Sequence, residues 1–405
     1  MSNIPNISVF EKCFSLISMK NFRCPVSDTY SKKLLTGHTI LLFVNAFLQN
    51  HGSLDEIADH LKANEDLQSY LGLKSISGSS LCRKLNEIPT HHLQEMCFEI
   101  LNQVAELKKP QESTSATSSE VGLLGILDST EIKLPKKAGE WAYTSKSKNA
   151  VKVHLLLGSF GQDNVYPEFF IPSTAGYADH EVADYILTSQ HHTHVMDRGY
   201  INYTLFSKWL ESNINFVVRL KESSRTKVIE EYSIETESLI TLDAKVEMKV
   251  PKTEETIIAR LVEYRDSDGN RYRVLTNRWD LSSENVAMIY KRRWCIELFF
   301  KWLKQNLKFE KLFSYKTTAV WNQIYLAFIA FGLCELVKDQ FENVKYTTKQ
   351  ILKKMICNWY QPWQKFFNLI TYKTSRTTRG RVKKGKPGRP RKHPRILKTK
   401  KVIYI

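Results

Sequence analysis

The chain has 405 residues, of which 42% are hydrophobic and 25% are charged, values that are ordinary for a soluble globular protein of two or three domains. Its net charge of +17 indicates a polyanionic partner, and nucleic acid is the usual one. Seven cysteines without a C-x-x-C pair argue against a disulfide framework and against a zinc finger.

The sequence favours a cytoplasmic location. The opening MSNIPNISVF has neither a basic region nor an apolar run, so we expect no secretory leader. The longest apolar run, Ile324–Cys334, is too short to span a bilayer. We therefore expect no membrane partner.

Residues 1–107 read as a helical domain. Leu34–Gln49 is apolar and lacks proline, and Ser53 begins a further helix in which Glu56 completes a capping box. A third helix after a Ser/Gly turn carries Arg83 and Lys84. This order is typical of a helix-turn-helix DNA-binding module, and a plain helical bundle with solvated charges explains it equally well.

Residues 108–120 read KKPQESTSATSSE, which is a linker composition. After it the pattern becomes mixed. Five strands and two helices are predicted in the order strand Gly122–Asp128, strand Val151–Leu157, strand Val165–Pro172, helix Asp179–Leu187, strand His194–Asp197, helix Tyr203–Ser212 and strand Phe216–Leu220. The alternation indicates an α/β domain over residues 121–315.

The rest of the chain divides into four parts. Residues 222–280 read as a β-rich insertion in that domain, with a hairpin at Asp268-Gly269. A long helix, Ser283–Leu307, and a buried helix, Trp321–Val337, follow, the second within a helical region at 316–372. The tail at 373–405 contains 14 Lys or Arg and no acid, which leaves about +3 for the rest of the chain, and we expect it to be disordered without DNA.

Three acidic residues lie at positions in the predicted fold where they could together bind a metal ion. Asp128 and Asp197 each end a predicted strand, and ligands in open α/β sheets gather at such ends. Glu297 lies on the long helix. Carboxylates are the ligands that Mg²⁺ prefers, and two such ions can hold both oxygens of an in-line phosphoryl displacement.

The helix around Glu297 strengthens this hypothesis. At about 100° per residue, Tyr290, Arg293, Glu297 and Lys304 share a stripe roughly 60° wide, and Lys301 lies beside it. An apolar set on another side is made by Ile296, Phe299, Leu303 and Leu307. The cations could hold DNA phosphates beside a metal, whereas the simpler alternative is a surface pair between Arg293 and Glu297.

The spacing Y-x2-R-x3-E-x6-K, occupied by Tyr290, Arg293, Glu297 and Lys304, resembles the signature of insertion-sequence transposases of the IS-four family. G-I-L-D-S-T at 125–130 and V-M-D-R-G-Y at 195–200 look like the two aspartate strands of that family. The resemblance covers roughly residues 121–328 and reaches the N-terminal domain only loosely. Some members place further acids after the second aspartate, where this sequence has Arg198-Gly199-Tyr200.

The resemblance implies a ribonuclease-H-like catalytic domain that binds two Mg²⁺ or Mn²⁺ ions through Asp128, Asp197 and Glu297. It implies cut-and-paste transposition, with nicking, hairpin formation, reopening and strand transfer into target DNA. The implied partners are the terminal inverted repeats of the element, target DNA and a second copy of the chain, on the bacterial nucleoid. The expected DNA contacts are Tyr290, Arg293, Lys304, Lys301, Arg198, Arg389 and Arg391.

Several other sequence features each allow a functional and a structural interpretation. His191, His192 and His194 could bind a transition metal, but an all-oxygen site needs no imidazole, so we favour a structural role. Lys146 and Lys148 could face DNA or form a solvated turn. P-G-R-P-R-K at 387–392 resembles an AT-hook core, or is part of a generic polybasic tail. Trp279 is a candidate wedge for a flipped base.

Two rival functions remain from the sequence. A ribonuclease-H-like nuclease would hydrolyse DNA without joining strands. A domesticated DNA-binding protein would carry no chemistry, and the complete set of three acids counts against it.

Overall fold

The computed structural model describes residues 7–17, 19, 22–109, 121–161, 164–187, 189–235, 238–341 and 346–372. Its helices are α1 (Val9–Ser15), α2 (Thr36–Leu48), α3 (Leu54–Ala63), α4 (Glu65–Leu71), α5 (Gly78–Glu87), α6 (Thr90–Lys108), α8 (Asp179–Ile186), α9 (Tyr203–Glu211), α10 (Ser283–Lys291), α11 (Trp294–Asn306), α12 (Thr317–Asp339), α13 (Thr348–Cys357) and α14 (Trp363–Thr371). Its strands are β1 (Leu123–Leu134), β2 (Tyr143–Ser145), β3 (Lys148–Ser159), β4 (Val165–Thr174), β5 (His192–Met196), β6 (Asn215–Arg219), β7 (Lys227–Glu231), β8 (Ile240–Lys249), β9 (Thr256–Arg265) and β10 (Arg271–Thr276). The expected mixed α/β class is confirmed.

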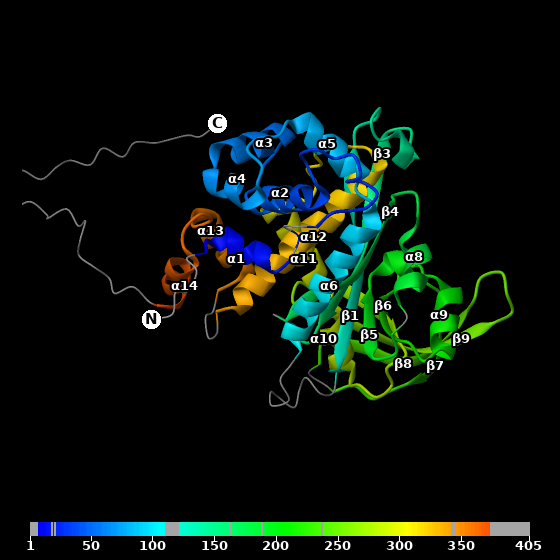
Figure 1. The fold of residues 1–405 in the computed structure, drawn as a ribbon. Coiled ribbons are helices and arrows are strands. Elements are labelled where there is room, and N and C mark those ends of the chain that lie inside the picture. The colour runs from blue at the N-terminus through cyan, green and yellow to red at the C-terminus, as the bar shows by residue number, and fades with distance from the viewer. Residues whose placement is uncertain are drawn as a thin grey trace, which may run out of the picture.

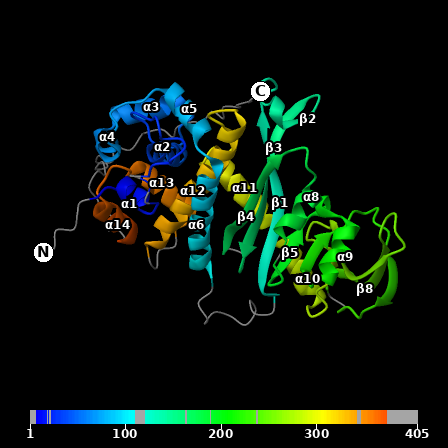
Figure 2. The ribbon, with the colours of Figure 1, turned by 45° about the vertical axis from the view of Figure 1, so that its right-hand side comes forward.

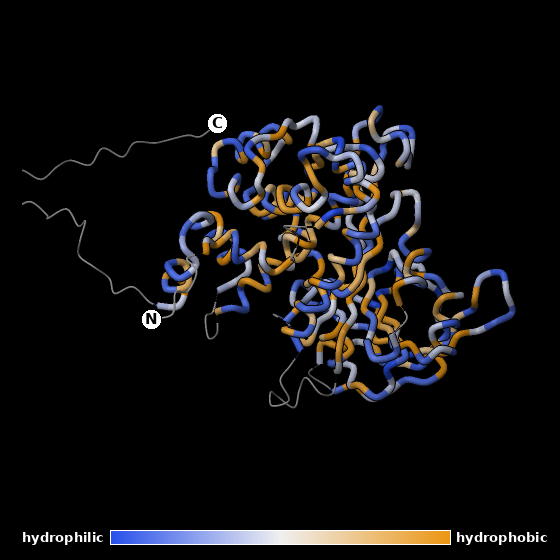
Figure 3. Tube along the Cα trace, viewed as in Figure 1, coloured by the Kyte–Doolittle hydropathy of each residue, from blue (hydrophilic) through white to orange (hydrophobic). Residues whose placement is uncertain are grey.

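Most of the helices and the strands lie on different sides of the molecule, while α8, α9 and α10 lie beside the strands (Figure 1, Figure 2). The helices α1 to α5, with α13 and α14, lie on one side, and the strands lie on the other (Figure 1). Turning the molecule shows α6, α11 and α12 standing between the two (Figure 2). Apolar positions gather along these central helices and the strands that they meet (Figure 3).

The N-terminal helices begin where the sequence predicts. The Ser53 hydroxyl accepts a hydrogen bond from the Glu56 backbone N–H at 3.1 Å, which starts α3. The Glu56 carboxylate accepts from the N–H of Gly52 rather than of Ser53, so the capping pair is shifted by one residue. The first contact supplies a partner for an N–H group of the first helical turn, and the second holds the chain just before the helix.

One basic residue of the predicted recognition helix is buried. Lys84 on α5 forms an ion pair with Asp28 at 2.6 Å, and both side chains are 4% exposed. Lys84 also donates to the hydroxyl of Ser31 at 2.8 Å. The prediction that α5 offers both Arg83 and Lys84 to DNA or to solvent is therefore wrong for Lys84, while Arg83 is exposed.

The helix α12 is the centre of the helical side. It packs against α6, α2 and α5, and Trp359 from the segment before α14 donates to Asn45 on α2 at 2.7 Å. Among the described residues α12 is the one helix long and apolar enough to cross a membrane, but 94% of its apolar window is buried in the protein. The buried helix predicted at 321–337 is confirmed, extended at both ends.

A single sheet runs through the strand-rich side. Within the described residues it has ten strands in the order β2-β3-β1-β5-β6-β10-β9-β8-β7, and β4 pairs with β3. Pairing is antiparallel except between β1 and β5 and between β5 and β6. The predicted hairpin at Asp268-Gly269 is confirmed as β9 and β10, and β10 pairs with β6, so the strands of segment 222–280 extend the same sheet.

Alternation along β1 sends successive side chains to opposite faces of the sheet. Leu124 and Ile126 belong to a core shared with α6, α11 and α12, whereas Leu127 belongs to a second core under α8 and α9. By the same period of two, Asp128 points toward α11 and Ser129 points toward α8. The core on the α12 side includes Phe170 stacked on Phe328, with ring centroids 4.1 Å apart.

Candidate active site

Two aspartates lie at the point where two parallel strands part. The pairing of β1 with β5 ends with Leu127 opposite Met196, so Asp128 and Asp197 are the next residues on neighbouring strands. Asp197 directly follows Met196, the last residue of β5, so this strand ends one residue before its predicted end. Asp128 does not end β1, because the strand continues to Leu134 while paired with β3, and that prediction is wrong.

Asp197 is held by the turn that follows β5. Its Oδ1 accepts a 2.7 Å hydrogen bond from the backbone N–H of Gly199, and the chain continues as a short 3-10 helix, Arg198–Tyr200. Arg198 is exposed at the start of that turn. The fold therefore fixes one oxygen of Asp197 and leaves the Arg198 side chain free to meet a partner.

The long helix predicted over 283–307 is two helices. Helix α10 ends at Lys291 and α11 begins at Trp294, and the turn between them uses i→i+3 bonds, from the N–H of Cys295 to the carbonyl of Arg292 and from the N–H of Ile296 to the carbonyl of Arg293. Tyr290 therefore stands on α10, whereas the Glu297 and Lys304 side chains stand on α11. The predicted apolar side of α11 is confirmed, because Ile296, Phe299, Leu303 and Leu307 are buried.

Arg293 joins two of the three acids. One guanidinium nitrogen lies 2.5 Å from Glu297 Oε1, and another lies 3.4 Å from Asp128 Oδ2. The Arg293 side chain is 16% exposed. The Arg293–Glu297 pair of the simpler alternative is therefore present, and the same guanidinium also connects α11 to Asp128 of β1.

Burial and charge shape the acidity of this group. Burial raises the pKa of Asp128 to about 6, and the charge of Asp197 adds to the rise. The hydrogen bond that Asp128 Oδ1 accepts from the Ser129 N–H and the charge of Arg293 act in the opposite direction without cancelling it. In a partly buried site, each of two neighbouring carboxylates disfavours the ionisation of the other.

A cavity of about 390 Å³ opens between β1 and α11. Asp128 and Glu297 line it together with Lys301 and Lys304, and its remaining wall is formed by Ser129, Thr130, Phe300 and Gln305. Lys304 Nζ lies 2.9 Å from Glu310 Oε1, in the segment that follows α11. Both lysines were predicted to lie near Glu297, and in the structure they line the same cavity as Asp128 and Glu297.

The donor set suits a hard divalent cation. Asp128, Asp197 and Glu297 offer only carboxylate oxygens, which Mg²⁺ and Mn²⁺ prefer. In the described part of the chain no three His, Cys, Asp or Glu side chains are already grouped as a metal site. The Arg293 guanidinium lies between Asp128 and Glu297, so these two carboxylates already share one positive charge.

If Asp128 is a metal ligand, the affinity for divalent cations should decrease as the pH falls below about 6. A raised pKa means that Asp128 becomes protonated below about pH 6 and is ionised above it, and only the ionised form binds a cation. We expect Mn²⁺ affinity, followed by electron paramagnetic resonance, to be flat above about pH 7 and to weaken by about tenfold per pH unit below 6. An affinity that stays constant down to about pH 5 would remove Asp128 from the metal ligands.

The sequence analysis missed two residues of this region. Ser129 donates from its N–H to Asp128 Oδ1 at 2.8 Å and from its hydroxyl to Asp179 Oδ1, also at 2.8 Å. Asp179 is the first residue of α8 and contributes to the field at Asp128. No spacing in the sequence pointed to Asp179, because the contact comes from the way α8 packs on β1.

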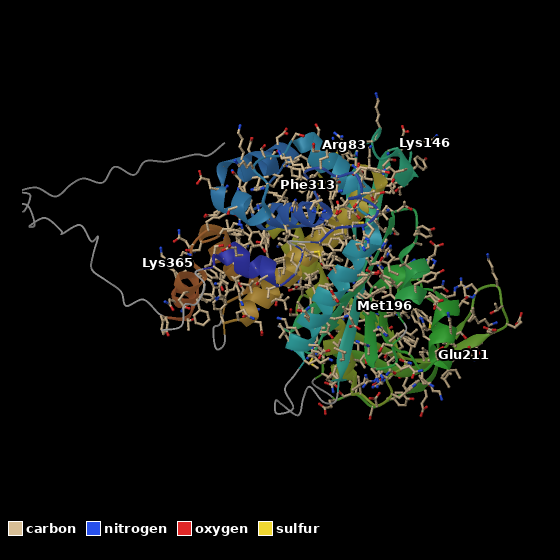
Figure 4. All side chains as sticks on the ribbon, in the orientation of Figure 1. Arg83, Lys146, Met196, Glu211, Phe313 and Lys365 are labelled. Atoms are coloured by element: carbon tan, nitrogen blue, oxygen red, sulfur yellow. The ribbon has the colours of Figure 1, made fainter. Side chains whose placement is uncertain are left out.

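The remaining candidates lie elsewhere. The imidazoles of His192 and His194 bind the hydroxyl and carbonyl of Ser189, which agrees with a structural role. Lys148 pairs with Glu131, and Lys146 projects outward from the turn between β2 and β3 (Figure 4). Trp279 is 45% exposed after β10. Arg389 and Arg391 lie outside the described residues.

The chain is similar to known transposases. Residues 120–333 match the family model described as "Transposase DDE domain". A protein of Geobacillus stearothermophilus with the name "Probable transposase for insertion sequence element IS5377" is 28% identical over 282 residues, which are 68% of this chain and 71% of that protein. A protein of Sinorhizobium fredii, also named as a transposase, is 27% identical over 224 residues, or 53% of this chain and 60% of its own length.

Proposed function

Since the chain belongs to the transposase DDE domain family, we propose that it moves an insertion sequence by cut-and-paste DNA transposition. The observation that carries the proposal is the Asp128–Arg293–Glu297 bridge beside Asp197, inside the matched region. Transposases of this family are nucleases and transesterases that act on DNA and generally use divalent metal ions.

Three carboxylates would hold the metal ions. We assign Asp128, Asp197 and Glu297 as ligands of two Mg²⁺ or Mn²⁺ ions. Bound there, such ions supply positive charge that stabilises the attacking and leaving oxygens of a phosphodiester. The chain itself fixes the two aspartates on neighbouring strands, and the buried side of α11 fixes Glu297, so the ligands do not need to be ordered when the ions bind.

The cations around the cavity would hold the DNA backbone. Arg293, which lies between Asp128 and Glu297, would donate to a phosphate beside the scissile bond, and a bound metal would supply the positive charge that the two acids need in its place. Lys301 and Lys304 line the same cavity and extend this contact along α11. Arg198 is exposed next to Asp197, and we propose that it binds a further phosphate of the DNA backbone.

Tyr290 has a different environment. It is 4% exposed and lies near Tyr272, with ring centroids 6.0 Å apart. Burial raises its pKa, and the charge of Arg293 opposes that rise. We infer that Tyr290 orients Arg293 and reaches a phosphate only at the edge of the site.

The reaction would proceed in steps at each end of the element. Water nicks one strand, the new 3′-OH attacks the opposite strand to give a hairpin, and the hairpin is reopened. The 3′-OH then attacks target DNA, so one phosphodiester is broken for each one that is formed. We propose that two copies of the chain act together on paired terminal inverted repeats.

The ribonuclease-H-like fold and the domain division are implied by the resemblance to the transposase family. The parallel β1–β5–β6 centre with flanking helices is compatible with a ribonuclease-H-like domain over 121–315. We propose that the rest of the chain divides into a helical N-terminal DNA-binding domain at 1–107, a linker at 108–120, the insertion at 222–280, a helical region at 316–372 and a tail at 373–405. The signature residues support membership of the IS-four family.

Strand joining separates this function from simple hydrolysis. We expect a precleaved element end, incubated with supercoiled target plasmid and Mg²⁺, to become covalently joined to the plasmid. A product that consists only of shortened DNA would favour the hydrolytic nuclease and would refute transposition.

Deleting residues 373–405 should weaken DNA binding and flatten its salt dependence. The deletion removes 14 Lys and Arg, and each lost phosphate contact reduces the slope of log K against log salt by about 0.9. The measurement is a binding isotherm at several salt concentrations. An unchanged slope would show that the tail does not touch phosphate.

The variant carrying both Arg389→Gln and Arg391→Gln is the companion to this deletion. An AT-hook predicts a loss that is selective for A·T-rich DNA, because arginines enter its narrow minor groove. A polybasic tail predicts the same small loss on all sequences.

A further inference from the structure

An acid that the family signature does not include lies next to the candidate metal site. Asp179 opens α8, and its Oδ1 accepts a hydrogen bond from the Ser129 hydroxyl at 2.8 Å and from Lys152 at 3.1 Å. Its side chain is 27% exposed, so it is neither a core residue nor a freely solvated one.

Helix capping does not explain this carboxylate. The N-cap position of α8 is Ala178, and the carboxylate that returns to the Ala178 N–H belongs to Glu181, at 2.7 Å. Among the residues that the structure describes, every polar contact of Asp179 is made by Oδ1 and none joins it to a backbone N–H. Its contacts point instead to the sheet.

Ser129 couples Asp179 to the first aspartate. The hydroxyl of Ser129 donates to Asp179, and the N–H of the same residue donates to Asp128 Oδ1 at 2.8 Å. Because alternation along β1 sends Asp128 to the α11 face and Ser129 to the α8 face, one dipeptide connects the two sides of the sheet. A displacement of Asp179 would therefore be felt at Asp128.

Gly199 leaves a space between Asp179 and the second aspartate. A methyl group at Gly199 would lie 3.0 Å from Asp197 Oδ1 and 3.7 Å from Asp179 Oδ2. Both carboxylates therefore border the same small space, and the oxygen of Asp179 that faces it is the one without a partner in the described part of the chain. A side chain at position 199 would fill this space.

A buried histidine shows that hydrogen-bonding capacity remains unused here. His154 is fully buried and its Nε2 lies 2.9 Å from the hydroxyl of Ser173. Its Nδ1 faces Asp179 Oδ1 at 3.5 Å and has no hydrogen-bond partner in the region described. Buried polar atoms normally have partners, so this cluster can accept a further polar group such as water.

We propose that Asp179 is a positioning residue of the metal site, an inference that rests on the proposed function. Mg²⁺ and Mn²⁺ keep several water ligands when only a few carboxylates bind them. Asp179 Oδ2 accepts a hydrogen bond from such a water beside Asp197, while Oδ1 holds Ser129 and through it Asp128. Residues that orient ligands in this way change metal affinity by about 10- to 100-fold when they are replaced.

The test is Mn²⁺ binding to the full chain without DNA, followed by electron paramagnetic resonance. We expect Asp179→Asn to weaken binding by about 10- to 100-fold without changing the melting temperature. The matched control is Asp184→Asn on the same helix, whose carboxylate pairs with Lys208 at 2.6 Å and should leave affinity unchanged. Gly199→Ala fills the space between Asp197 and Asp179 and should also weaken binding, with no change of charge.

The variant Asp128→Ala distinguishes a failure of the proposed role of Asp179 from a failure of the proposed metal site. If Asp128→Ala loses Mn²⁺ and Asp179→Asn binds it like the wild type, the role of Asp179 is refuted and the metal site stands, whatever Gly199→Ala does, because its methyl group would also lie 3.0 Å from Asp197 Oδ1. If Asp128→Ala binds like the wild type, the proposed metal site itself is refuted. An equal loss in Asp184→Asn and Asp179→Asn would show a general charge effect and would also overturn the role of Asp179.

Discussion

Replacing Glu297 with alanine is expected to reduce DNA cleavage by at least about 10³-fold, as loss of a central catalytic group does in other enzymes. Glu297 is the acid that α11 contributes to the cavity, and Arg293 holds it near Asp128. DNA binding should be retained or slightly strengthened, because the substitution removes a negative charge beside the phosphate-binding lysines. Cleavage of a labelled element end and a filter-binding isotherm measure the two effects separately.

The control for this variant is Glu211→Ala. Glu211 is exposed at the end of α9 (Figure 4), and it is not one of the residues that line the cavity. It should cleave like the wild type. Normal cleavage by Glu297→Ala would remove Glu297 from the active site, whereas a loss of both binding and cleavage would mean that α11 had lost its structure.

The second large effect is expected on stability. Phe328 is fully buried at the middle of α12, where it stacks on Phe170 of β4 and meets the ring edge of Phe309. Phe328→Ala should lower the free energy of unfolding by about 3 to 5 kcal/mol, because it removes buried surface and leaves a cavity between the helices and the sheet. Guanidinium unfolding followed by circular dichroism measures the change.

Leu369→Ala is the matched truncation at the surface. Leu369 is 44% exposed on α14, and its loss should cost less than about 0.5 kcal/mol. Equal stability of the two variants would contradict the packing of α12 against β4. A large loss in Phe328→Ala alone would support a helical side and a sheet that share one core.

Local patterns predicted most of the elements because their signals are carried by neighbouring residues. The capped start of α3 at Ser53 and the apolar side of α11 depend on residues within one or two turns. The strands that lead to Asp128 and Asp197 were predicted from the short apolar run before each acid, whereas the parallel pairing of these strands was not predicted. These features depend on periodicity, which the sequence displays directly.

The errors came from contacts between distant residues. Ser129-Thr130-Glu131 reads as the end of a strand, yet β3 pairs with β1 along its whole length and continues it to Leu134. The break between α10 and α11 has no proline or glycine to announce it. Lys84 reads as a surface cation, but Asp28, far away in the sequence, pairs with it in the interior.

Asp179 could not be found from the sequence for the same reason. It is one of 42 acids, and its relation to Asp128 exists only because α8 packs beside β1 and Ser129 faces that helix. The three carboxylates of the family pattern could be recognised by their spacing in the sequence. A residue that acts through another residue, as Asp179 does through Ser129, can be recognised only in the three-dimensional structure.

The most direct measurement is cleavage of labelled DNA that carries the flanking sequences of the gene, with Mg²⁺ or with EDTA, by the wild type and by Asp128→Ala. We predict nicks at defined ends that require Mg²⁺ and that Asp128→Ala does not make. Tight binding of this DNA by the wild type without any cut in Mg²⁺ would contradict the account and would identify a DNA-binding protein without chemistry.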